Sequence, residues 1–183
     1  MHDYLKTKYY FINKFDTNNI DQQDKQTIII YRNYISKKNN ELLILKFKKY
    51  CKKKGKKFFL ANNIKLAIKL NLDGVYIPSF NKSLSHLSYS YNKKFKIIGS
   101  AHNLHEVKNK ENQGCSSIFI SPIFKTKKSN YFLNIIRFNL IANKSKKKIV
   151  ALGGINSSNY KRIRLTKSTA LASISWIKKN RPK

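Results

Sequence analysis

Two consecutive glycines, Gly153 and Gly154, follow an apolar run that ends at Leu152. Glycine lets the backbone turn sharply and approach a ligand closely. Residues 156–158, an asparagine and two serines, have the side chains that cap helices, and they predict a helix beginning near Tyr160. A strand, a glycine pair and a helix start can together present backbone N–H groups and a helix dipole to an anion. The stretch therefore predicts a phosphate-binding loop, with an ordinary tight turn between strand and helix as the alternative.

A second stretch, SIFISPIFKT at residues 117–126, also runs from apolar residues into turn residues. This is the pattern of a buried parallel strand that opens into a loop at its carboxyl end. Similar strand patterns recur along the chain, over residues 9–12, 27–32, 57–61, 74–78, 96–101, 116–121, 149–152 and 170–174. Helical patterns alternate with them, over residues 39–54, 64–70, 104–112, 131–143 and 159–165, with a polar loop and weak helix over 81–94.

Eight strands that alternate with helices, without a long linker, predict a compact (β/α)8 TIM barrel in which residues 1–183 form one domain. Residues 16–26 are too few and too polar for a full helix, so the first helix should be reduced. A doubly wound open sheet is the alternative, because one missing element would change the strand count. In a barrel, ligands bind at the carboxyl ends of the strands, and phosphate binds near the last two.

The chain carries a net charge of +31, from 39 Lys and Arg against 8 Asp and Glu. Such an excess is typical of nucleic-acid binding, in which lysines neutralise phosphates. The other abundant residues are Asn, Ile, Tyr and Phe, whose codons are rich in A and T, so a base-biased genome is the alternative explanation. The lysine runs at residues 52–57 and 144–148 fall in predicted connections, where solvated charges belong. No RRM, KH or helix-turn-helix pattern occurs, so no specific nucleic-acid partner is expected.

Two cysteines, Cys51 and Cys115, are far apart and lack the spacing of a metal site. Their positions on apolar faces indicate reduced core thiols, as in a cytosolic protein. Lysines interrupt every apolar run near the amino terminus, which argues against a signal peptide or a membrane span. We therefore expect a cytoplasmic protein without a membrane partner.

Three segments carry a resemblance to a known family: GSAHN at 99–103, SPIFKT at 121–126 and ALGGI at 151–155. In this order and spacing the chain resembles the thiamine phosphate synthase and TenI family. DGVYIP at 73–78 and FLANN at 59–63 extend the likeness over nearly the whole chain. Members are (β/α)8 barrels that join hydroxymethylpyrimidine diphosphate to thiazole phosphate and release pyrophosphate, or, in the TenI branch, tautomerise the thiazole precursor. The resemblance implies small phosphorylated substrates, and its barrels often form homo-oligomers.

The resemblance also implies roles for individual residues. Arg32 would bind the pyrimidine diphosphate, and Ser100 would contact the leaving pyrophosphate. His102 matches the acid/base residue of the tautomerase branch, with a structural histidine at a strand end as the alternative. The remaining implied contacts are Asn62 beside the pyrimidine, Thr126 and Lys128 on the thiazole side, and Gly153, Gly154, Ile174 and Ser175 at the thiazole phosphate.

The chain departs from the family pattern at its charged positions. Asn63 and Asn81 stand where the synthases have two aspartates that bind Mg²⁺, and asparagine brings a carbonyl ligand without charge. On the second strand only Arg32 remains of a glutamine, arginine and lysine set, with Ile30 and Tyr34 at the other two places. The sequence thus leaves three hypotheses: a divergent synthase, a TenI-like tautomerase or silent thiazole-phosphate binder, and a basic RNA-binding protein.

Overall fold

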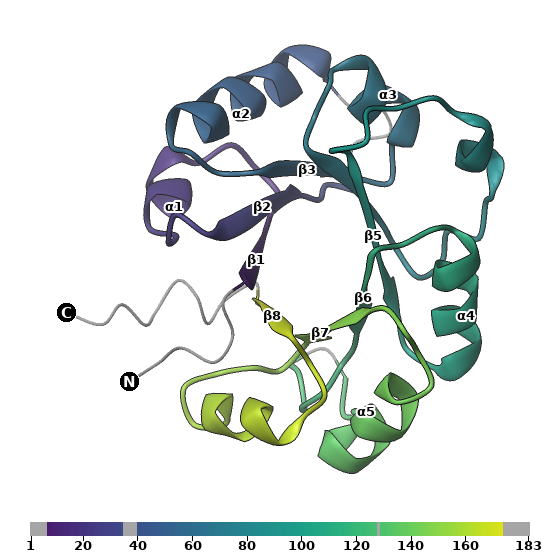
Figure 1. Ribbon diagram of the computed structural model, residues 1–183. Helices are drawn as coiled ribbons and strands as arrows, with labels where there is room; N and C mark the ends of the chain where they lie inside the picture. The colour runs from purple at the N-terminus through teal and green to yellow at the C-terminus, as the bar shows by residue number, and fades with distance from the viewer. Residues whose placement is uncertain (1–6, 35–39, 128, 174–183) are drawn as a thin grey trace.

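A computed structural model describes residues 7–34, 40–127 and 129–173 (Figure 1). Its strands are β1 (Thr7–Ile12), β2 (Thr27–Tyr31), β3 (Phe58–Ala61), β4 (Gly74–Ile77), β5 (Lys96–Ala101), β6 (Ser117–Ile120), β7 (Lys148–Leu152) and β8 (Ala170–Ser173). The α-helices are α1 (Thr17–Asp21), α2 (Glu41–Lys53), α3 (Ile64–Lys69), α4 (Leu104–Asn112) and α5 (Asn134–Ala142). Two short 3₁₀ helices are η1 (Ser85–Ser88) and η2 (Tyr160–Leu165).

The eight strands form one closed barrel in which every neighbouring pair is parallel. Tyr9 of β1 is paired on one side with Ile28 of β2 and on the other with Ala172 of β8, which closes the ring. The helices lie outside this ring, as Figure 1 shows. The predicted (β/α)8 barrel is therefore confirmed, and the open doubly wound sheet is excluded.

One local prediction differs from the structure: the segment expected as a helix over 159–165 is the 3₁₀ helix η2. The loop and weak helix predicted over 81–94 correspond to a loop that contains the four-residue 3₁₀ helix η1. The first helix is reduced as predicted, since α1 has five residues and starts at an Asp16 side-chain cap. No helix in the described part of the chain is long and apolar enough to cross a bilayer.

Aromatic side chains fill the centre of the barrel. Tyr9, Phe11, Tyr76 and Phe119 are all buried and meet edge to face, with ring centroids 4.8 to 6.1 Å apart. Their inward direction follows from the pleat, which sends alternate residues of each strand to the barrel axis. Each such aromatic pair adds about 1 kcal/mol beyond area burial. The cluster separates the two ends of the barrel.

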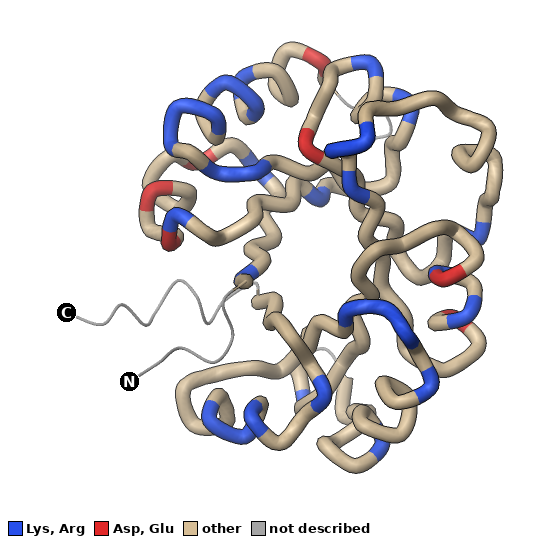
Figure 2. The backbone as a smooth tube through the Cα atoms, in the orientation of Figure 1, with Lys and Arg blue, Asp and Glu red and all other residues tan. Residues whose placement is uncertain are grey.

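Lysines and arginines lie on helices and connections all around the barrel (Figure 2). Not all of them are solvated. Lys56, in the run predicted to be a solvated connection, is only 7% exposed, and its Nζ donates to the carbonyls of Gln23 and Asp24, each at 2.6 Å. This lysine ties the start of β3 to the connection before β2. The expected burial of Cys51 and Cys115 is confirmed, and both are unpaired.

Candidate active site at the carboxyl ends of the strands

Arg32, Tyr76 and Ser100 come together at the carboxyl end of the barrel. The Arg32 backbone N–H donates to the Ile12 carbonyl at 2.8 Å, which continues the pairing of β1 and β2 by one residue. Its guanidinium carbon lies 4.7 Å from the centre of the Phe11 ring, a cation–π contact. Burial raises the pKa of Tyr76, and the neighbouring Ser100 and Arg32 side chains act in the opposite direction. The Tyr76 side chain thus lies close to both Arg32 and Ser100, which the sequence indicated separately.

A cavity of about 240 Å³ opens beside Arg32, at the ends of β1 and β2. Arg32 and Lys14 give its wall positive charge, and Asn13 and Asn19 supply amides. Asp16 is nearby in sequence, but its carboxylate caps α1: one oxygen accepts from the Asn19 backbone N–H at 3.0 Å and the other from the Asn19 amide. The cavity therefore presents hydrogen-bond donors and cations, which suit an anionic group.

Asn62 and Asn81 face each other at the ends of β3 and β4. The Asn62 Oδ1 accepts from the Asn81 Nδ2 at 2.7 Å, and Asn62 has the left-handed backbone conformation, with φ of 61°. Asn81 Oδ1 accepts from the Ser83 N–H, and Asn63 Oδ1 caps α3 by accepting from the Leu66 N–H. The pair at the mouth is thus Asn62 with Asn81, while the Asn63 side chain serves the helix start.

This donor set does not fit a Mg²⁺ site as arranged here. Sites that hold a hard cation beside a diphosphate use one or two carboxylates, whereas Asn63 and Asn81 are neutral and their carbonyl oxygens already accept hydrogen bonds. The described residues also contain no group of three or more His, Cys, Asp or Glu that could hold a metal ion.

Lys110 holds the loop that carries Asn81. The Lys110 side chain is fully buried, and its Nζ donates to the carbonyls of Pro78 and Asn81 and to Gln113 Oε1, at 2.8, 2.7 and 2.8 Å. Gln113 in turn donates to the carbonyls of Asn81 and Ser83. Burial lowers the pKa of Lys110. The sequence predicts a helix at Lys110 but indicates no role for its side chain, because only the fold brings these carbonyls to it.

His102 is exposed and oriented by two contacts. Its backbone N–H donates to Glu106 Oε2 at 2.8 Å, and its Nδ1 lies 2.7 Å from the Ser121 carbonyl oxygen. A carbonyl can only accept, so Nδ1 carries the proton. In the neutral ring Nε2 is then the basic nitrogen, which is the arrangement that a general base needs.

The glycine pair lies against the loop that follows β6. Gly153 and Gly154 have φ values of 93° and 72°, and a Cβ on Gly154 would lie 2.3 Å from the Phe124 carbonyl oxygen. Phe124 N–H donates to the Gly153 carbonyl at 3.1 Å. These glycines therefore permit close contact between two loops of the chain, the loop after β7 and the loop after β6. The 3₁₀ helix starts at Tyr160 as predicted, but without a side-chain cap.

Of the other residues predicted to contact substrate, the structure describes Thr126 only. Thr126 is half-buried in the loop after β6, where its Oγ1 accepts from the Ser129 N–H at 3.2 Å. Lys128, Ile174 and Ser175 lie outside the described residues. Sequence analysis missed Tyr76, although its place on the inward face of β4 could have been inferred from the alternation in DGVYIP.

A closed parallel barrel with a cation, hydroxyls and a glycine pair at the carboxyl ends of its strands has the architecture of a (β/α)8 enzyme. A family model described as thiamine monophosphate synthase matches residues 19–177. The chain therefore belongs to the thiamine monophosphate synthase family.

Individual relatives agree with this assignment. A thiamine-phosphate synthase of Pelagibacter ubique is 33% identical over 147 residues, covering 78% of this chain and 70% of the relative. One of Prochlorococcus marinus is 33% identical over 117 residues, covering 62% of this chain but only 34% of the relative. A solved structure, thiamine phosphate pyrophosphorylase from Pyrococcus furiosus, superposes with a TM-score of 0.73 at 18% identity, covering 94% of this chain and 87% of that one. It supports the fold.

Proposed function

We propose that the protein is a divergent thiamine phosphate synthase, which joins hydroxymethylpyrimidine diphosphate to thiazole phosphate. The observation that carries the proposal is the Arg32, Tyr76 and Ser100 cluster at the barrel mouth. In the reaction the bond between the pyrimidine methylene carbon and the diphosphate oxygen breaks, and the oxygen keeps the electron pair. The thiazole nitrogen supplies the pair for the new carbon–nitrogen bond. The leaving pyrophosphate gains negative charge as it departs.

Arg32 would take up this charge, because a guanidinium can donate two parallel hydrogen bonds to a phosphate. The Ser100 and Tyr76 hydroxyls lie beside it as further donors, and Lys14 adds a second cation at the adjoining cavity. Fixed donors of this kind need no rearrangement during the reaction. We propose that these cations neutralise the pyrophosphate in place of carboxylate-bound metal, so that turnover is insensitive to EDTA.

Two exposed aromatic rings at the mouth suit the pyrimidine ring. Tyr34 and Phe80 meet edge to face with ring centroids 5.5 Å apart, and they are 47% and 63% exposed. Tyr34 is close enough to Arg32 and Tyr76 for both to affect its pKa, which burial raises. Aromatic rings gain about 1 kcal/mol from such contacts beyond area burial. We propose that the pyrimidine packs against this pair while its diphosphate reaches Arg32.

The test is a single-turnover assay with both substrates, with Mg²⁺ or with EDTA, and detection of thiamine phosphate by mass. We expect product under both conditions and its loss in Arg32→Ala. Arg137→Ala is the matched control, since Arg137 is an exposed arginine on α5. Absence of product from the wild-type protein under both conditions would contradict the proposed synthase activity. Activity that EDTA abolishes would contradict the proposal that cations replace the metal.

The orientation of His102 favours a second candidate, a TenI-like tautomerase. A thiazole tautomer forms when a base removes a proton from one ring position and an acid returns one to another, and an exposed histidine whose Nδ1 is held by a carbonyl can do both through Nε2. The measurement is turnover of the thiazole tautomer by the wild type and by His102→Gln. His105→Gln is the control, because His105 is exposed on the same helix that follows His102. Equal rates in the two variants would refute the role of His102.

Two further properties complete the proposal. Cys51 and Cys115 are buried and unpaired, which suits a reducing compartment, so we propose that the protein works in the cytoplasm. Its substrates would be small phosphorylated compounds. Assembly into a homo-oligomer stays a prediction, which light scattering of the purified protein would test.

A further inference from the structure

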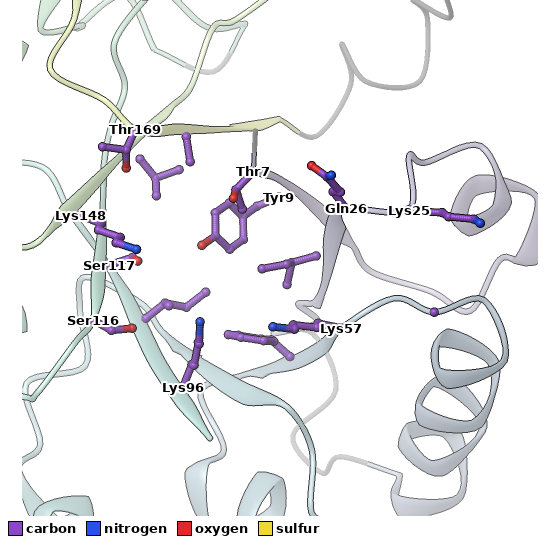
Figure 3. A pocket seen from close by; sticks show the side chains of 16 residues that line it. Thr7, Tyr9, Lys25, Gln26, Lys57, Lys96, Ser116, Ser117, Lys148 and Thr169 are labelled. Atoms are coloured by element: carbon purple, nitrogen blue, oxygen red, sulfur yellow. The ribbon is translucent and has the colours of Figure 1, made fainter. Parts of the chain in front are cut away.

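The amino-terminal ends of the strands surround a second cavity, at the end of the barrel opposite the candidate active site. It has a volume of about 840 Å³, within the usual range for small-molecule sites, and Figure 3 shows the side chains that line it. The aromatic cluster of Tyr9, Phe11, Tyr76 and Phe119 lies between this cavity and the mouth that holds Arg32. A ligand here would therefore bind apart from the proposed reaction.

Three lysines point into this cavity from alternate strands: Lys57 directly precedes β3, while Lys96 and Lys148 begin β5 and β7. In Figure 3 their ammonium groups are directed toward the centre of the cavity. The pleat explains this direction, because each lysine comes two residues before a side chain of the barrel interior. Those interior side chains are Phe59, Ile98 and Val150.

The three lysines are exposed, but they converge on one cavity and do not spread over an outer face of the barrel. Equivalent inward positions on three alternate strands form one layer of a (β/α)8 barrel, so the three cations share a single level around the axis. Below them in the barrel the lining is apolar, from the Tyr9 ring and the side chains of Ile28 and Phe59.

No described carboxylate neutralises these lysines. None of the three ammonium groups has a hydrogen bond or ion pair within the described part of the chain. Two acidic residues that precede β4 and β2 at this end of the barrel are otherwise engaged: Asp73 accepts from the Phe58 N–H at 2.9 Å, and Asp24 pairs with Lys8 at 2.9 Å. Three like charges that converge without a counterion repel one another, and a bound anion relieves that repulsion.

We propose that this cavity is a binding site for an oligophosphate, a group with two or more linked phosphates. Such a group carries about the charge that three lysines balance, and the side-chain hydroxyls of Ser116, Ser117 and Thr169 line the same cavity as further donors. The shared chemistry is the oligophosphate chain, whether free or esterified to an organic ring. The apolar lining would add affinity only for the esterified form.

The test is isothermal titration of the purified full chain with inorganic tripolyphosphate and with ATP, at about 0.15 M ionic strength to screen weak surface attraction. We expect saturable binding that falls by about tenfold or more when Lys57, Lys96 and Lys148 are all changed to Gln. The control changes Lys49, Lys52 and Lys53 to Gln. These lysines are exposed on α2, and their substitution removes the same charge from the protein. A circular dichroism spectrum confirms that each variant is folded.

Three results would overturn the site: no saturable binding of either probe, an equal loss in the lining and control variants, or loss of binding in Arg32→Ala. The last result would place the anion at the mouth. Tighter binding of ATP than of tripolyphosphate would support the site and identify an ester as its ligand, whereas equal affinities would support a free oligophosphate. The assay measures binding alone, so its outcome does not depend on whether the protein makes thiamine phosphate.

Discussion

Changing Lys110 to Met should destabilise the protein although the two side chains are similar in length. The ammonium makes three hydrogen bonds, to Pro78, Asn81 and Gln113, and bonds to a charged donor contribute about 1.5–3 kcal/mol each. Two effects reduce the sum. Burial lowers the pKa of Lys110, so the ammonium itself is costly to bury, and the Pro78 and Asn81 carbonyls each keep one other donor. We expect a net loss of about 3 kcal/mol.

Urea unfolding of the two proteins measures this difference. Lys108→Met is the control, since Lys108 lies on the same helix and makes one exposed ion pair with Glu111, which contributes less than about 1 kcal/mol. An unfolding free energy of Lys110→Met within about 0.5 kcal/mol of that of Lys108→Met would refute the reasoning. It would mean that the loop from Pro78 to Ser83 is held by packing and not by the ammonium.

Three other changes test the site and the core. Gly154→Ala should destabilise the protein by more than about 3 kcal/mol in urea unfolding, because its Cβ would meet the Phe124 carbonyl. The control Gly55→Ala is also at positive φ but has nothing within 4 Å of the added Cβ, so it should cost about 1 kcal/mol. Equal losses in the two variants would contradict this reasoning. Tyr76→Phe should lower kcat on the order of tenfold with little change in KM, measured in the synthase assay, and an unchanged kcat would remove Tyr76 from the site. Burial raises the pKa of the Cys51 and Cys115 thiols from 9.0 to about 12, so the unfolded chain releases these protons first and stability should fall between pH 9 and 12. The double Ala variant should lose less stability over that range, and parallel pH profiles would refute the assignment.

The barrel could be predicted because its strands have strong local signals. TIIIYR and SIFISP combine β-branched and apolar residues with turn residues at their ends, and this alternation with helical segments leaves few topologies. The type of the last helix could not be predicted. Its sequence has helical spacing, but the structure forms a six-residue 3₁₀ helix without a side-chain cap.

The site was predictable only in part, because partners distant in sequence decide what a side chain does. Lys56 was predicted to be solvated and Lys110 was given no role, yet both are buried and donate to carbonyls of other segments. Gly153 and Gly154 predicted a backbone that approaches a phosphate, and the sequence could not show that the loop after β6 approaches them as well. Arg32 and Ser100 came from the resemblance, whereas the place of Tyr76 beside them required the register of β4.

The engagement of the acidic residues explains why cations dominate both ends of the barrel. Each carboxylate in the described part of the chain already accepts from a cation or from a backbone N–H: Asp16, Asp21, Asp24, Glu41, Asp73, Glu106 and Glu111. A carboxylate recruited to hold a metal at the mouth would have to give up one of these contacts, and with it a helix cap, a strand start or an ion pair. Among the described residues, Arg32 at one end of the barrel and Lys57, Lys96 and Lys148 at the other therefore have no carboxylate partner. Affinity for phosphorylated ligands should consequently depend steeply on salt at both sites.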